Sequence, residues 1–69
     1  MPAAFKRALN QTYEAKPPGQ RYFKKKEVEA LVSHLDAMHP QLSRQHPLSY
    51  KQVRVFFRGI EFFQPLRKN

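Results

Sequence analysis

The chain has 69 residues, no cysteine, and 13 Lys and Arg against five Asp and Glu, which gives a formal net charge of +8. This length is typical of one domain, and the absence of cysteine excludes disulfides and thiolate metal sites. No apolar segment is long enough to span a membrane or to serve as a signal peptide, so an intracellular, cytoplasmic protein without membrane contact is expected.

The charge divides the chain into three parts. Residues 1–26 carry seven bases and one acid, and residues 40–69 carry six bases and one acid, whereas residues 27–39 carry three acids and no Lys or Arg. Two basic flanks therefore enclose an acidic segment. A positive charge of this size attracts polyanions or acidic protein surfaces.

Residues 1–20 are predicted to form a flexible or nascent-helical basic arm. Apolar residues within 3–15 recur at roughly helical spacing, but only three of them are large, and an isolated helix of this length is marginal in water. The Lys-Pro-Pro-Gly-Gln sequence at 16–20 breaks a helix and is typical of a linker. We therefore expect one compact domain over 21–66 and a basic tail over 67–69.

The segment 24–39 is predicted to be an amphipathic helix. Its large apolar residues follow the spacing i, i+3, i+4, i+7 and i+10, which places them on one face. These residues are Val28, Leu31, Val32, Leu35 and Met38. Two glutamates in the first turns suit the helix dipole, and Pro40 ends the helix. Residues 40–49 are then expected to be an extended connection, held to the core by Leu42 and Leu48.

Residues 50–66 fit two structures. A β-hairpin over about 52–64, with an Arg-Gly turn, suits the content of Val, Phe and Ile, and a glycine would cost a helix interior about 1 kcal/mol. A helix would begin at Ser49 with Gln52 as its capping-box partner. We favour the hairpin, packed on the helix 24–39 in a small α+β fold with a flexible N-terminus. The alternative is an all-α, helix-turn-helix-like domain of three helices.

No set of residues is arranged for catalysis or metal binding. His34 and His39 are five residues apart, so they lie on different sides of a helix and do not form a tetrahedral zinc pattern. Ser33 and His34 are adjacent and cannot face each other as nucleophile and base. The two glycines are too far apart for a phosphate-binding loop. We expect no enzyme activity, no cofactor, no metal and no small-molecule substrate.

Basic residues beside aromatic rings are the candidate binding residues. A first cluster lies at the start of the predicted helix, where backbone N–H groups favour anions; it consists of Arg21, Tyr22, Lys24, Lys25 and Lys26. A second basic cluster consists of Arg44, Lys51, Arg54, Arg58, Arg67 and Lys68. The candidate binding residues there are Lys51, Arg54 and Arg58, with the ring of Phe56. The bases would contact phosphates and the rings would stack on nucleobases. On the helical alternative, the outer face of a recognition helix carries Lys51, Arg54, Arg58 and Glu61. The alternative interpretation is that both clusters only keep the surface solvated and bind no ligand, because such a surface has the same composition.

Two resemblances accompany these patterns. Leu48–Gly59 is similar to the start of a homeodomain recognition helix, with Leu-Ser, a Gln-Val pair and an aromatic residue, but the family's Trp and invariant Asn have no counterpart. The interval 40–47 is also too short for that family's middle helix.

In size, charge, lack of cysteine and basic ends, the chain resembles the small phage-encoded regulators of bacterial RNA polymerase, a group that no residue motif defines. This resemblance implies a protein partner near nucleic acid in the host cytoplasm.

The sequence therefore predicts a small, basic, non-enzymatic regulator of transcription that binds DNA or RNA as a monomer. The alternative is a phage-type protein that binds an acidic surface of bacterial RNA polymerase and inhibits or redirects the enzyme. Glu27, Glu29 and Asp36 favour a protein partner, because a surface that binds only phosphates gains nothing from three acids.

Overall fold

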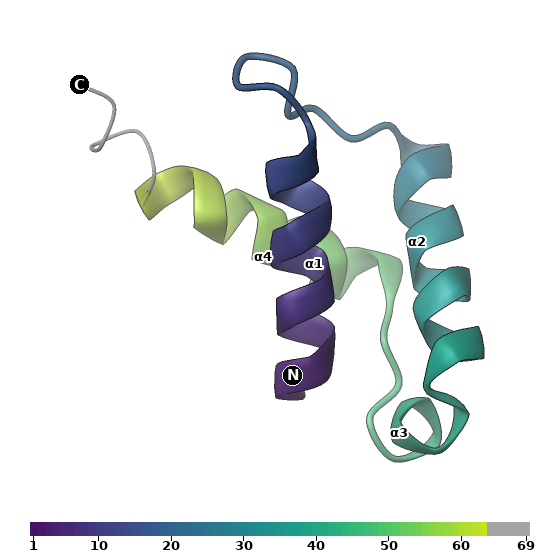
Figure 1. Ribbon diagram of the computed structural model, residues 1–69. Helices are drawn as coiled ribbons and strands as arrows, with labels where there is room; N and C mark the ends of the chain where they lie inside the picture. Colours follow the sequence, from purple (N-terminus) through teal and green to yellow (C-terminus); the bar gives the residue numbers. More distant parts are fainter. Residues whose placement is uncertain (64–69) are drawn as a thin grey trace.

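The computed structural model describes residues 1–63, which form four helices and no strand. They are α1 (Ala3–Ala15), α2 (Lys25–Met38), the short α3 (Pro40–Gln45) and α4 (Tyr50–Phe63). Figure 1 shows α1 and α2 running in opposite directions, with α4 crossing behind α1 and α3 turning the chain at the far end of α2. The expected basic tail at 67–69 lies outside the described residues.

The expected β-hairpin over 52–64 is wrong, because this segment forms α4. Two reciprocal hydrogen bonds begin the helix: Gln52 N–H donates to Ser49 Oγ over 3.2 Å, and Ser49 N–H donates to Gln52 Oε1 over 3.1 Å. Val53 is buried while Val55 is 62% exposed, although a strand would have placed the two on one face. The helical apolar stripe and its cap outweigh the β-propensity of the individual residues. The all-α alternative therefore describes the fold.

Helix α2 confirms the amphipathic helix predicted at 24–39. Lys24 N–H donates to the Glu27 carboxylate over 2.8 Å, which satisfies one of the backbone donors left free at a helix start. The face predicted to be apolar carries the buried Val28 and Leu35. Its last member, Met38, is 58% exposed, so the buried stripe ends one turn before the helix does.

Residues 40–45 form α3 instead of the expected extended connection. Pro40 ends α2 and also occupies the first turn of α3, where the missing N–H would have had no helical partner and the fixed φ suits a helix. Leu48 is buried and Leu42 packs against the core, as the sequence analysis expected.

The N-terminal segment contributes to the core and is not a flexible terminus. Phe5, Leu9 and Tyr13 recur every four residues along α1, and all three are buried. The Tyr13 ring lies 6.2 Å from the ring of Phe23 and 5.8 Å from that of Phe57, and these two rings stack at 4.4 Å. Burial contributes about 1.5–3 kcal/mol for each large apolar side chain, which stabilises a helix that is marginal alone.

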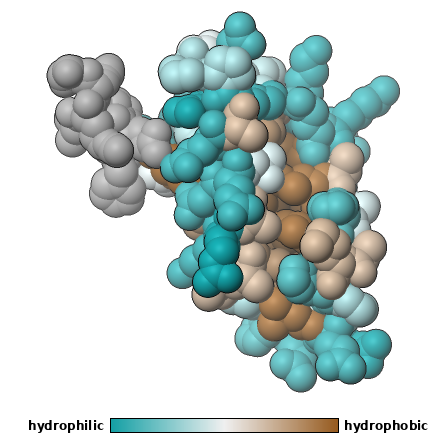
Figure 2. Space-filling model, viewed as in Figure 1, coloured by the Kyte–Doolittle hydropathy of each residue, from teal (hydrophilic) through white to brown (hydrophobic). Residues whose placement is uncertain are grey.

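Hydrophobic and hydrophilic side chains separate clearly on the face shown in Figure 2. Hydrophilic side chains cover the outer side of α1 and project around the ends of α2, and hydrophobic ones fill the space between these two helices. Within residues 1–63, no helix combines the length and the apolarity needed to cross a membrane.

Candidate nucleic-acid interface

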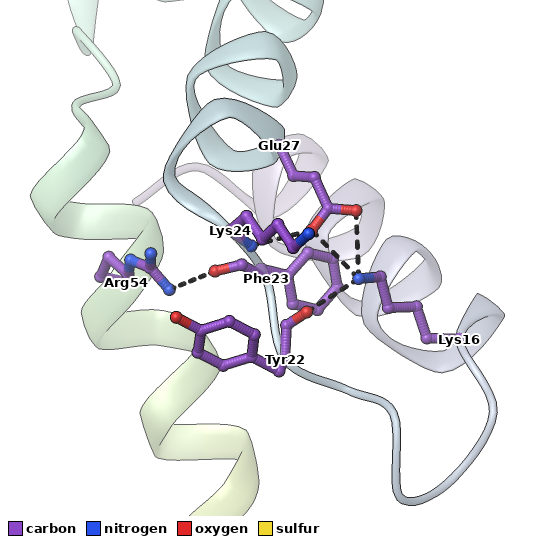
Figure 3. A network of polar contacts seen from close by, with 6 residues as sticks. All are labelled: Lys16, Tyr22, Phe23, Lys24, Glu27 and Arg54. Atoms are coloured by element: carbon purple, nitrogen blue, oxygen red, sulfur yellow. Dashed lines mark hydrogen bonds and ion pairs between the residues drawn. The ribbon is translucent and has the colours of Figure 1, made fainter.

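The segment between α1 and α2 is held in place by Lys16 (Figure 3). Its Nζ donates to the carbonyl oxygen of Tyr22 over 2.9 Å and forms an ion pair with the Glu27 carboxylate at 3.1 Å. The same ammonium lies 4.3 Å from the centre of the Phe23 ring, a cation–π arrangement. Lys16 therefore fixes the segment that carries the first predicted cluster.

Arg21 is half-buried and closes the end of α1. Its Nε donates to the Lys16 carbonyl oxygen over 3.0 Å, and its Nη2 reaches the Glu14 carbonyl oxygen at 3.5 Å. The guanidinium also lies 5.2 Å from the centre of the Tyr13 ring. Carbonyls in the last turn of a helix lack helical donors, so Arg21 supplies hydrogen-bond donors to carbonyl oxygens at the end of α1.

Arg54 connects α4 to the segment before α2. Its Nη1 donates to the carbonyl oxygen of Phe23 over 2.7 Å (Figure 3). Its Nε donates to Tyr50 Oη over 2.9 Å. Both acceptors are uncharged, so neither of them offsets the positive charge of the guanidinium. Arg54 thereby brings together two clusters that the sequence analysis identified separately.

A groove opens where these two clusters meet. Its walls are aromatic rings and arginines from residues 21–23 and α4, with Tyr13 from α1. The lining residues are Tyr13, Arg21, Tyr22, Phe23, Arg54, Phe57, Arg58 and Glu61. The cavity volume is about 220 Å³, below the range of roughly 300–1,000 Å³ that is typical of small-molecule pockets. Four of the nine predicted binding residues line this groove.

Tyr13 lines the groove and has a shifted pKa. Burial raises the pKa of Tyr13, and the nearby Glu61 carboxylate raises it further, whereas the Arg21 guanidinium acts in the opposite direction. The lining residues include one carboxylate and three guanidinium groups, so the net charge of the groove is positive.

The remaining predicted residues lie outside the groove. Lys24, Lys25 and Lys26 are exposed at the start of α2, and Lys51 is exposed on α4. Within residues 1–63, the ion pair between Lys16 and Glu27 is the only one closer than 4 Å. The lysine side chains at the start of α2 therefore face solvent without a carboxylate partner from the described part of the chain.

Phe56 does not join the other predicted residues. It is half-buried, with its ring 6.5 Å from that of Phe57, and it lines a separate apolar recess with Met1 and Val55. This recess lies on the other side of α4 from the groove, because Phe56 and Arg54 project about 200° apart on a helix.

Two of the three acids on α2 have structural contacts. Glu27 accepts hydrogen bonds from the Lys24 backbone and from Lys16, and Ser43 Oγ donates to the Asp36 carboxylate over 2.7 Å. These contacts cap α2 and join it to α3. Glu27 and Asp36 therefore do not indicate a protein partner by themselves, because contacts within the fold account for both of them.

The contacts of Glu27 change its titration. The hydrogen bond from the Lys24 backbone N–H lowers the pKa of the Glu27 carboxyl, and the hydrogen bond from Lys16 lowers it further. Both donors favour the ionised carboxylate. Glu27 thus remains charged at pH values where an ordinary glutamate begins to take up a proton.

The described residues offer no metal centre. No group of three His, Cys, Asp or Glu within residues 1–63 is placed to hold a metal ion. The His39 ring packs edge-on against the ring of Phe5 at 5.8 Å, which gives that histidine a place in the packing.

Comparison of the chain with protein-family models, curated proteins and solved structures gives no match. Sequence reasoning missed that Tyr13 lines the groove and that Lys16 holds the segment beside it. The spacing of Tyr13 four residues after Leu9 was a signal for its burial, but no local pattern indicates that Lys16 reaches the residues after the proline linker.

Proposed function

We propose that this chain is a small non-enzymatic regulator of transcription that binds nucleic acid. The observation that supports this proposal is the meeting of two basic clusters at Arg54, which donates to the Phe23 carbonyl oxygen next to Lys24. This hydrogen bond holds the segment before the exposed lysines of α2 against the helix that carries Arg54 and Arg58. Phosphate backbones are the ligands that such basic clusters attract most strongly.

The charge balance supports a polyanion as the ligand. Residues 1–63 contain 11 of the 13 Lys and Arg and all five acids, a net charge of +6. The single close ion pair in this range leaves most of the basic groups available for phosphates. The lysines at 24, 25 and 26 also surround the start of a 14-residue helix, where the helix dipole adds to their attraction for anions.

A salt titration of binding tests the proposal. The anisotropy of a fluorescent oligonucleotide would be measured with increasing protein at several salt concentrations. Binding is expected at about 50 mM salt, with log K falling by roughly 0.7–0.9 per neutralised phosphate as log salt rises. Absence of binding to both single-stranded and duplex probes at low salt would contradict the proposal.

A matched pair of triple variants shows where the phosphates bind. Replacement of Lys24, Lys25 and Lys26 by Gln is expected to reduce the salt slope by about two to three units, because each lost phosphate contact removes roughly 0.7–0.9. The control replaces Lys6, Arg7 and Arg44 by Gln, which removes the same charge from exposed positions outside the groove. Equal loss of slope in both variants would mean that only the total charge matters.

A second candidate function is binding to bacterial RNA polymerase through the apolar recess on the other side of α4. Val55 is 62% exposed in this recess, and Lys51 lies at its rim, which suits an acidic protein surface that presents an apolar side chain. The test is a pull-down in which the immobilised chain is mixed with purified, nuclease-treated polymerase and the retained polymerase is measured. Val55→Glu should abolish retention, whereas Met38→Glu, at a position of similar exposure on α2, should not. Equal retention of both variants would exclude the recess.

A further inference from the structure

We infer that the groove between residues 21–23 and α4 binds one unpaired base of a single-stranded nucleic acid, with Tyr22 as the stacking platform and the groove arginines on the adjoining phosphates. The inference rests on the proposed nucleic-acid binding and adds the form of nucleic acid that is bound.

Tyr22 is the aromatic residue that the groove presents to a ligand. It is 71% exposed, whereas Tyr13, Phe23 and Phe57 in the same groove are buried. Its ring is thus open to a ligand, and the three buried rings line the same groove. Stacking on an exposed ring binds bases of any sequence, since every base has a π-face.

The backbone that carries Tyr22 is fixed on both sides. Lys16 binds the carbonyl oxygen of Tyr22 at 2.9 Å, and Arg54 binds the carbonyl oxygen of Phe23 at 2.7 Å. Figure 3 shows both contacts on the short segment that leads into α2, with one donor from the end of α1 and the other from α4. A backbone held in this way loses little conformational entropy when a ligand binds.

The arginines of the groove are held in position and still have donors to offer. A guanidinium has five N–H groups, and Arg21 and Arg54 each use two of them on neutral oxygen acceptors. Three donors remain on each for a ligand. Arg58 is exposed one turn further along α4 and forms no hydrogen bond or ion pair with another described side chain. Arginine in this setting binds phosphate oxygens in pairs of hydrogen bonds.

The Glu61 carboxylate makes the groove unsuitable for a ligand that consists of phosphate alone. A carboxylate repels phosphate but accepts a hydrogen bond from the amino group of cytosine or adenine. Its presence beside Tyr22 and the arginines in one groove fits a ligand that has both a base and a phosphate. In a duplex the base is stacked between its neighbours and presents only an edge, so it cannot lie on Tyr22. The groove therefore suits a single strand.

The experiment compares a fluorescent dC oligomer of about 12 nucleotides, which is within the usual site size for single-strand binding, with a duplex of the same length. The single strand is expected to bind more tightly. Tyr22→Ala should weaken single-strand binding by about 5- to 100-fold and leave duplex binding unchanged. Tyr22→Phe retains the ring and should bind within about twofold of the original chain.

A second pair of variants tests the phosphate contact. Arg58→Gln should weaken single-strand binding more than Arg44→Gln, because Arg44 is an exposed arginine on α3 outside the groove. Tyr22 and Arg58 are both exposed, so the far-UV circular dichroism of the variants should match that of the original chain.

The outcomes separate this inference from the proposed function. If the chain binds the duplex as tightly as the single strand, or if Tyr22→Ala binds the dC oligomer normally, the groove is not a base site, while a steep salt slope would still support the proposed function. If neither probe binds at low salt, the proposed function itself fails, and the inference fails with it.

Discussion

Arg54 and Phe23 are 31 residues apart in the chain, and the Arg54 guanidinium donates a 2.7 Å hydrogen bond to the Phe23 carbonyl oxygen. The ring of the same phenylalanine stacks on Phe57, one turn after Arg54 along α4. Residue 23 is therefore bound to α4 through its backbone and through its side chain. The position of the exposed Tyr22 depends on both contacts.

Replacement of Arg54 by Met should destabilise the protein by about 1.5–3 kcal/mol, because a half-buried carbonyl loses a charged hydrogen-bond donor. Urea unfolding followed by circular dichroism measures this change. Arg58→Met on the same helix is the control, and its exposed side chain should change the free energy of unfolding by less than about 0.5 kcal/mol. Equal effects of the two substitutions would show that the hydrogen bond to Phe23 does not contribute to stability.

The candidate site could be predicted from the sequence only in part. The two basic clusters follow from composition, and Tyr22 is identified by its place beside them. Their common groove depends on a contact between residues 31 positions apart, and no local pattern encodes such a pairing. The structural roles of the half-buried Arg21 and Arg54 could not be predicted for the same reason. Both arginines donate to backbone carbonyls that come within reach only in the folded chain.

Helix α4 shows a different limit of sequence analysis. The capping pair Ser49 and Gln52 was recognised, and the structure contains both of its hydrogen bonds. The expected hairpin depended on the β-propensity of Val and Phe and on the cost of Gly59 in a helix interior, and these features pointed against the helix that the cap indicated. Each of these propensities amounts to about 1 kcal/mol at most, whereas each large side chain that α4 buries, such as Val53 and Phe57, contributes about 1.5–3 kcal/mol.

Gly59→Ala distinguishes helix from hairpin directly. Gly59 lies within α4, it does not have a positive φ, and a Cβ added there would meet no atom within 4 Å. The substitution should therefore stabilise the protein by about 0.5–1 kcal/mol, since alanine restricts the unfolded chain and favours a helix. The urea midpoint of unfolding measures this gain. A loss of stability would indicate a turn with a positive φ at this position, which alanine does not tolerate.

The burial of α1 is tested by Leu9→Ala. Leu9 is fully buried, so its truncation should cost about 2–5 kcal/mol, which is most of the stability that a chain of this size has. Loss of cooperative thermal unfolding, or a much lower midpoint, is the expected readout. Asn10→Ala, at the next and exposed position, is the control and should have little effect. If Leu9→Ala unfolded as the original chain does, the N-terminal segment would be the flexible arm that the sequence analysis expected.

The lowered pKa of Glu27 predicts how stability depends on acidity. The folded state holds this carboxyl ionised through Lys24 N–H and Lys16, so its pKa in the folded chain lies below its value of about 4.5 in the unfolded chain. Between these two values the unfolded chain binds more protons, and stability rises with pH. The contribution of Glu27 is therefore complete above its unfolded pKa and is lost as the pH falls through the folded pKa.

Glu27→Gln isolates this contribution. The glutamine carbonyl can still accept the hydrogen bond from Lys24 N–H, but it does not titrate and does not pair with the Lys16 charge. Thermal midpoints measured from pH 6 down to pH 3 should fall less steeply for the variant than for the original chain. Glu29→Gln removes an exposed acid two residues further along α2 and should leave the steeper fall in place. If the two variants gave the same pH profile, the contacts of Glu27 with Lys16 and with the start of α2 would not be the source of the acid sensitivity.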